Sequence, residues 1–257
     1  MSGSTQEKIR FAGSRGGELA GVLETPVEGA PVGWALFAHC FTCSKDLRVV
    51  REIAGRLTDA GFGVLRFDFT GLGQSGGEFA DSDFAANIGD LHAAAGVIRE
   101  RGGRPGLVIG HSLGGAAALH AAGEMEGCDA VATIGAPFDP EHVTHLLRGA
   151  SFDGDGTAEV SIGGRPFRIT ESFVGSLRDR DPAARIRGLG RALLVFHSPV
   201  DSVVGIEHAE RIYTAARHPK SFVSLGHADH LLQNPGDARF CGDVLAAWAR
   251  HQLAPDA

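Results

Sequence analysis

The sequence has few cysteines, no run of basic residues and no long apolar segment. Four irregularly spaced cysteines in 257 residues are too few for a disulfide-stapled scaffold, so we expect a reduced, cytoplasmic protein. Lys and Arg number 24 against 31 Asp and Glu, a net charge of −7 without a basic cluster, so neither nucleic acid nor an anionic membrane is an expected partner. No apolar run reaches the ~18 residues of a membrane span. Because residues 1–8 are polar, we expect no targeting segment either.

The remaining composition is that of a globular protein with one large core. Hydrophobic residues make up 43% of the chain and charged residues 21%, which excludes a disordered tail and a membrane channel. The length fits one α/β domain, and we assign residues 1–257 to it. Small molecules are the expected partners, and no apolar stripe is strong enough to indicate an oligomer.

Short apolar runs alternate with longer helical patterns along most of the chain. The apolar runs are residues 34–38, 64–68, 107–109, 130–134, 192–196 and 221–225, and the helical patterns are residues 45–60, 84–101, 113–125, 207–217 and 237–251. Strands that are apolar on both faces and separated by helices predict an α/β fold, with a mostly parallel central sheet and helices on both faces. Upstream, residues 9–11 and 19–25 flank a Ser-Arg-Gly-Gly turn, which predicts a β-hairpin at the sheet edge.

One segment breaks this alternation. From about residue 138 to 187 the chain is rich in Gly, Asp and Arg, and residues 160–169 indicate a hairpin. An insertion of this length between two core strands predicts a small cap or lid. The alternatives are an insertion without a role in the site and an interface flap.

The pattern Gly-x-Ser-x-Gly occurs twice, and only one copy has the context of a nucleophile. The copy at residues 73–77 lies in a loop with no helix directly after it. The copy at residues 110–114 follows a strand and opens a helix, as in a nucleophile elbow, where the serine occupies a tight turn with small neighbours. We therefore predict Ser112, rather than Ser75, as a catalytic nucleophile.

A serine hydroxyl needs a base, and imidazole titrates near neutrality. In the order serine, acid, histidine, the base follows the last strand, where His227 and His230 both stand. Asp201, after the fifth apolar run, is the predicted acid that orients the imidazole, and Asp139, after the fourth run, is the alternative. The two histidines lack a third ligand at a suitable spacing for a metal, so no metal or other cofactor is expected.

Two backbone N–H groups are needed to stabilise the anion formed at the attacked carbonyl. One belongs to Leu113, directly after the nucleophile. We assign the other to Phe41, in the loop of residues 39–46 after the first strand of the parallel sheet.

These motifs together resemble the serine-hydrolase branch of the α/β-hydrolase fold superfamily. They are His39-x-Phe41, residues 68–75, residues 110–115, Asp201 and His230. The resemblance spans about residues 9–251 and is strongest to the hydrolase module often fused to an OsmC-like domain. It implies the α/β-hydrolase fold, favours His230 over His227 as the base, and implies a carboxylesterase akin to feruloyl or monoacylglycerol esterases. No OsmC-like segment occurs within these 257 residues.

One departure from this resemblance concerns Cys40, where most relatives carry glycine. Cys40 and Cys43 also match the spacing of a redox motif. We expect the two cysteines to be packing residues, with redox modulation of an esterase or a separate redox activity as alternatives.

The expected reaction is two-step acyl transfer from a small ester through an acyl-enzyme at Ser112. The cap carries many charged residues and no amphipathic apolar face, so soluble short-acyl or aromatic esters are expected rather than lipid droplets. Thioesterase, amidase or peptidase, and perhydrolase activities use the same triad and stay open. So do a binding protein without turnover and a thiol-redox protein that uses Cys40 and Cys43.

Overall fold

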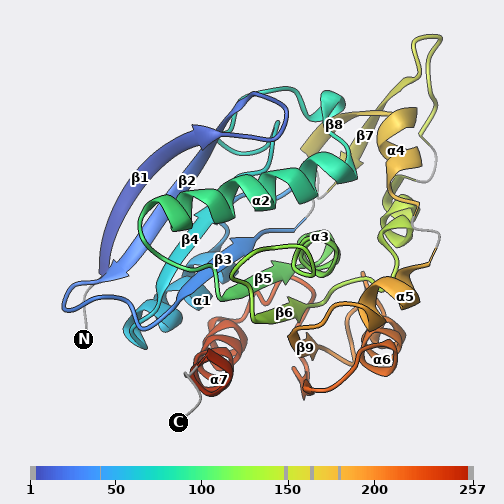
Figure 1. Ribbon diagram of the computed structural model, residues 1–257. Coiled ribbons are helices and arrows are strands. Elements are labelled where there is room, and N and C mark those ends of the chain that lie inside the picture. Colours follow the sequence, from blue (N-terminus) through green and yellow to red (C-terminus); the bar gives the residue numbers. More distant parts are fainter. Residues whose placement is uncertain (1–3, 41, 148–149, 163–164, 179–180, 254–257) are drawn as a thin grey trace.

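The computed structural model describes residues 4–40, 42–147, 150–162, 165–178 and 181–253 (Figure 1). Its centre is an eight-stranded sheet in the order β1-β2-β4-β3-β5-β6-β9-β10. The strands are β1 (Ser4–Ala12), β2 (Glu18–Pro26), β3 (Trp34–Ala38), β4 (Gly63–Phe67), β5 (Leu107–His111), β6 (Ala130–Ile134), β9 (Ala192–His197) and β10 (Lys220–Ser224). β1 and β2 pair antiparallel as the predicted edge hairpin, β2 pairs antiparallel with β4, and every other pair is parallel. The prediction of a mostly parallel sheet is confirmed.

Helices cover both faces of this sheet, as predicted. α1 (Arg48–Asp59) and α7 (Pro235–Leu253) share one apolar cluster with one face, and α2 (Phe84–Glu100), α3 (Leu113–Ala121) and α6 (Ile206–Ala215) share a second cluster with the other. Every residue of β4, β5, β6 and β9 is buried. Burial on both faces explains why these strands are continuous apolar runs in the sequence.

The described part of residues 138–187 places a hairpin and a short helix beside the start of α2, and a second short helix beside α6 (Figure 1). This segment contains the 3-10 helix η2 (Pro140–Leu147), the antiparallel hairpin β7 (Thr157–Ile162) and β8 (Arg165–Thr170), and the short helices α4 (Glu171–Ser176) and α5 (Pro182–Arg187). Phe79, in the 3-10 helix η1 (Phe79–Asp81), packs against Phe167 and Phe173 with ring centroids 5.6 and 5.4 Å away. This aromatic contact fixes the hairpin and α4 to the body of the protein.

Parallel strands place the ends of β3, β5, β6, β9 and β10 at one edge of the sheet. Loops that follow such strands form the usual ligand site of an open α/β sheet.

None of the described helices is long and apolar enough to cross a membrane.

Candidate active site

Ser112 occupies a strained turn between β5 and α3. Its φ of 55° and ψ of −126° lie outside the ordinary region for a residue with a side chain. Glycines make the turn possible, because a Cβ at Gly110 would lie 2.3 Å from the Gly114 carbonyl oxygen and one at Gly114 would lie 2.3 Å from the His39 carbonyl oxygen. The backbone N–H of Ser112 donates to Ile134 at 2.8 Å, which ties the turn to β6. The local sequence therefore forms the nucleophile elbow that its glycine pattern predicts.

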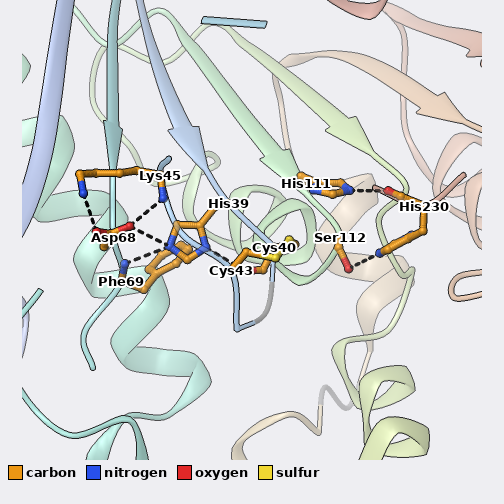
Figure 2. Close-up of a disulfide and its surroundings, with 9 residues drawn as sticks. All are labelled: His39, Cys40, Cys43, Lys45, Asp68, Phe69, His111, Ser112 and His230. Atoms are coloured by element: carbon orange, nitrogen blue, oxygen red, sulfur yellow. Dashed lines mark hydrogen bonds and ion pairs between the residues drawn. A yellow bond between two sulfur atoms is a disulfide. The ribbon is translucent and has the colours of Figure 1, made fainter. Parts of the chain in front are cut away.

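The structure brings Ser112, His230 and Asp201 into one hydrogen-bonded chain. His230 Nε2 lies 3.0 Å from Ser112 Oγ, and His230 Nδ1 lies 2.7 Å from Asp201 Oδ2 (Figure 2 shows the first contact). The three residues come from the loops after β5, β9 and β10. With Nδ1 donating to the carboxylate, Nε2 is left to accept the serine proton, which is the arrangement of a nucleophile and its general base.

The surroundings of Asp201 favour the ionised form of its carboxyl group. Its Oδ1 accepts hydrogen bonds from the backbone N–H groups of Val203 and Val204 at 2.8 and 2.9 Å. Burial raises the pKa of this carboxyl, but the hydrogen bond and charge of His230, together with the two amides, outweigh burial and hold the pKa below its usual value. An ionised Asp201 fixes the tautomer and orientation of the imidazole.

Two further histidines hold the turn that carries Asp201. His197 Nε2 lies 2.7 Å from the Val204 carbonyl oxygen, and His142 Nε2 lies 3.1 Å from the Val203 carbonyl oxygen. Each ring must donate to its carbonyl, so each carries its proton on Nε2. Burial lowers the pKa of His197, which favours this neutral form. The sequence gives no signal for these contacts because the acceptors are backbone atoms.

The three alternative site residues make other local contacts or are exposed, and none bonds to the predicted triad. Ser75 Oγ donates to the Asp68 carbonyl oxygen at 2.6 Å and accepts from the Ala20 amide at 2.9 Å, which makes it a loop brace. Asp139 accepts from the backbone N–H of Glu141 at the start of η2. His227 is exposed and forms no hydrogen bond with Ser112 or Asp201.

Of the two predicted oxyanion donors, only Leu113 lies among the described residues. Leu113 is the first residue of α3, so its N–H is one of the helical amides that have no partner inside the helix. Phe41, the other predicted donor, lies outside the described residues. Its loop is described on both sides, where the backbone N–H of Cys43 donates to the Cys40 carbonyl oxygen at 3.1 Å.

Cys40 and Cys43 are joined by a disulfide, with their Cα atoms 5.4 Å apart (Figure 2). Cys40 is buried, as expected of a packing residue, but the expected reduced state is wrong for this pair. The spacing of three residues spans a tight turn, which brings the two sulfur atoms within bonding reach. Cys128 and Cys241 are free and buried.

A buried charged cluster supports the loop that carries Cys40 and Cys43. Lys45 Nζ lies 2.7 Å from Asp68 Oδ2, and the Lys45 backbone N–H donates to Asp68 Oδ1 at 2.6 Å. His39 donates through Nδ1 to the Cys40 carbonyl oxygen at 2.8 Å while its Nε2 accepts from the Phe69 amide at 3.3 Å. Burial lowers the pKa of His39, so the ring stays neutral and both hydrogen bonds persist (Figure 2).

His111 is a site residue that the sequence alone does not single out. It stands next to the nucleophile, is fully buried, and its Nε2 lies 2.7 Å from the backbone carbonyl oxygen of His230. Burial lowers its pKa to about 3.

No group of three or more His, Cys, Asp or Glu side chains among the described residues is placed to hold a metal ion.

Comparison with known proteins shows where this architecture recurs. Residues 42–151 match the family model described as serine aminopeptidase, S33. The chain is 50% identical to the esterase domain of a Rhodothermus marinus protein, with 97% of this chain and 100% of that chain covered and a TM-score of 0.82. Est1E of Butyrivibrio proteoclasticus, solved with ferulic acid bound, is 19% identical, with 96% and 100% covered and a TM-score of 0.81. The uncharacterized protein YfhR of Escherichia coli K12 is 23% identical over 230 residues, which is 88% of this chain and 73% of that protein.

The likeness to Est1E shows the fold alone, whereas the Rhodothermus likeness is close enough in sequence and complete enough in coverage to show common descent. The expected α/β-hydrolase fold is thereby confirmed, while a link to an OsmC-like domain is not shown. The chain belongs to the α/β-hydrolase family that includes the Rhodothermus marinus esterase domain, and it is a hydrolase of that fold.

Proposed function

We propose that this chain is a serine carboxylesterase that hydrolyses small soluble esters with short or aromatic acyl groups. One observation carries the proposal. Ser112 Oγ lies 3.0 Å from His230 Nε2, and His230 Nδ1 lies 2.7 Å from a buried Asp201 carboxylate. A serine, a base and an acid in this order and geometry form the machinery of acyl transfer.

In the proposed reaction, Ser112 Oγ attacks the ester carbonyl carbon while His230 Nε2 takes its proton. The negative charge on the carbonyl oxygen is stabilised by the N–H groups assigned to Leu113 and Phe41. His230 then gives its proton to the departing alcohol oxygen, which leaves an acyl group on Ser112. Water, deprotonated by His230, releases the acid and restores the serine.

The surface of the cap supports a soluble substrate. Its apolar side chains Ala158, Val160, Ile169 and Phe173 are buried against the body of the protein. Its exposed face is charged, with Asp153, Asp155, Glu159, Arg168, Glu171 and Arg178. A lid that binds a lipid surface needs an exposed apolar face. The cap lacks one among its described residues, which favours small soluble esters over lipid droplets.

Hydrolysis of p-nitrophenyl esters from acetate to palmitate tests the proposal. We expect the wild type to favour the short esters and Ser112→Ala to lose turnover by about 10⁴-fold or more. Ser75→Ala, which alters the second copy of the same pentapeptide pattern, is the matched control and is expected to keep serine-dependent turnover. A fluorophosphonate should modify Ser112 in the wild type, as seen by mass spectrometry of the peptide. Equal ester turnover by wild type and Ser112→Ala would refute the proposal.

An amide substrate is the second candidate, because the matching family model is described as a serine aminopeptidase. The triad serves amides as well as esters, and only the pocket distinguishes them. Aminoacyl p-nitroanilides, assayed beside p-nitrophenyl esters, separate the two activities. A higher kcat/KM on the anilides would mean that the enzyme is an amidase rather than an esterase. Loss of both activities in Ser112→Ala would still support the assignment of Ser112, His230 and Asp201 as the catalytic triad.

A further inference from the structure

A narrow cavity lies directly beside the predicted oxyanion hole. Cys40, Leu113 and Gly114 form part of its wall. Its open space is small, about 10 Å³, which is room for about one water-sized group. A carbonyl oxygen held by the Leu113 N–H would therefore sit at the edge of this cavity, and a substituent of the same ester would enter it.

Most of the remaining wall is apolar. The rings of Phe69 and Phe79 and the side chain of Leu72 line it. All three side chains belong to the segment after β4, between the sheet and α2. Such a wall suits carbon chains and offers them no hydrogen bonds.

Asn87 is the exception in this wall. It stands on the first turns of α2, its residue is only 8% exposed, and its side chain lines the cavity. No described residue makes a hydrogen bond with its side-chain amide, although its own backbone N–H donates to Asp83 in the helix. Neither polar atom of this amide is among the fully buried side-chain atoms that lack a partner in the described part of the chain, so the amide keeps accessible surface that a ligand atom can reach. The amide is therefore suited to a ligand atom.

We propose that Asn87 is a specificity residue that binds a hydroxyl or carbonyl group on the acyl part of the substrate. This inference rests on the proposed esterase function. The amide both donates and accepts, so either group satisfies it. The acyl part is favoured over the alcohol part because the acyl group stays attached to Ser112 after the alcohol has left, and its polar substituent is about the size of group that the cavity between α2 and α3 admits. The small space limits the substrate class to esters of short hydroxy or oxo acids.

Matched ethyl esters that differ in one polar group test this assignment. Ethyl butyrate is compared with ethyl 3-hydroxybutyrate, and ethyl propionate with ethyl lactate and ethyl pyruvate, by titration of the released acid. In at least one pair, we expect the wild type to favour the polar ester by about tenfold or more in kcat/KM. In Asn87→Leu, and in the smaller Asn87→Ala, we expect the ratio within that pair to fall by about tenfold, whatever the intrinsic reactivity of the two esters.

Gln252→Leu is the matched control, since it removes an amide near the end of α7, away from this cavity, and should keep the wild-type ratio. Thermal melting and fluorophosphonate labelling of Ser112 show whether each Asn87 variant is folded. A wild type that hydrolyses all the esters without preference, or an unchanged ratio in both folded Asn87 variants, would overturn the inference and leave the esterase intact. No Ser112-dependent turnover of any ester would instead refute the proposed function.

Discussion

The side chain of His111 supports the backbone of His230, with Nε2 of the first residue 2.7 Å from the carbonyl oxygen of the second (Figure 2). The two rings also stack at an angle, with centroids 5.2 Å apart. The residue before the nucleophile thus holds the loop of the base, 119 positions further along the chain. Because the carbonyl can only accept, His111 carries its proton on Nε2, and its Nδ1 has no hydrogen-bond partner among the described residues.

Replacing His111 should slow the reaction more than it weakens substrate binding. His111→Phe keeps a ring but removes the donor, and we expect kcat to fall by about tenfold or more with KM nearly unchanged. His111→Gln can place an N–H near the position of Nε2, so it should recover most of the rate. The pH profile of kcat/KM gives a second readout, which we expect to change in His111→Phe and to stay close to that of the wild type in His111→Gln. Equal rates for the Phe and Gln variants would contradict this positioning role.

Buried neutral histidines should make the protein less stable in acid. Burial lowers the pKa of His111 from 6.5 to about 3 and, aided by His142, that of His208 to about 4. Below pH 6.5 the unfolded chain therefore binds more protons than the folded one, so the free energy of unfolding is fully present above that pH and falls as the pH drops.

His111→Gln removes one of these titrating groups. We expect its unfolding free energy, measured with urea at a series of pH values, to fall less steeply between pH 6.5 and about 3, by up to about 1.4 kcal/mol per pH unit. Parallel curves for the wild type and the variant would show that His111 does not contribute to acid unfolding.

The sequence predicts much of the fold and the elbow because both depend on local patterns. β5 and β6 lie between covering helices and must be apolar on both faces, so they are visible as apolar runs. The elbow needs small residues at fixed positions around Ser112, so it too leaves a local pattern.

What the sequence could not supply depends on contacts between distant segments. The residue pattern leaves both His227 and His230 open as the base and only the resemblance favours His230, whereas the fold of the last loop places His230 Nε2 3.0 Å from Ser112 Oγ. Asn87 appears in the sequence as one polar residue within an Ala-rich helix, and its role depends on the cavity that it faces. The spacing of Cys40 and Cys43 matches a redox motif, but we expected two packing residues, and the bond between them is visible only in the folded loop.

Breaking the Lys45–Asp68 pair should destabilise the protein strongly. Both side chains are almost fully buried, 2% and 0% exposed, and their charged atoms lie 2.7 Å apart. Lys45→Met leaves the Asp68 carboxylate without its cation, which costs about 3–5 kcal/mol in comparable buried pairs. Urea unfolding measures this loss. Lys8→Met, which removes an exposed lysine from β1, is the control, with an expected change within about 0.5 kcal/mol.

Reduction of the Cys40–Cys43 disulfide should affect catalysis more than folding. The bond closes a loop of four residues, for which chain entropy predicts about 2 kcal/mol of stabilisation at most. Cys40 also lines the cavity beside Leu113, so a relaxed loop would misplace groups around the substrate carbonyl. We expect dithiothreitol to lower the kcat of the wild type by several-fold and to change the melting temperature by only a few degrees.

The matched control for this prediction is the double variant Cys40→Ser/Cys43→Ser, which cannot form the bond. It should resemble the reduced wild type and show no response to dithiothreitol. Mass spectrometry with and without alkylation of thiols establishes the state of the pair in each sample. If the reduced wild type and the double variant both turn over short esters at the oxidised rate, the closed loop plays no part in holding the site, and the Lys45–Asp68 pair together with the His39 hydrogen bonds is sufficient to position it.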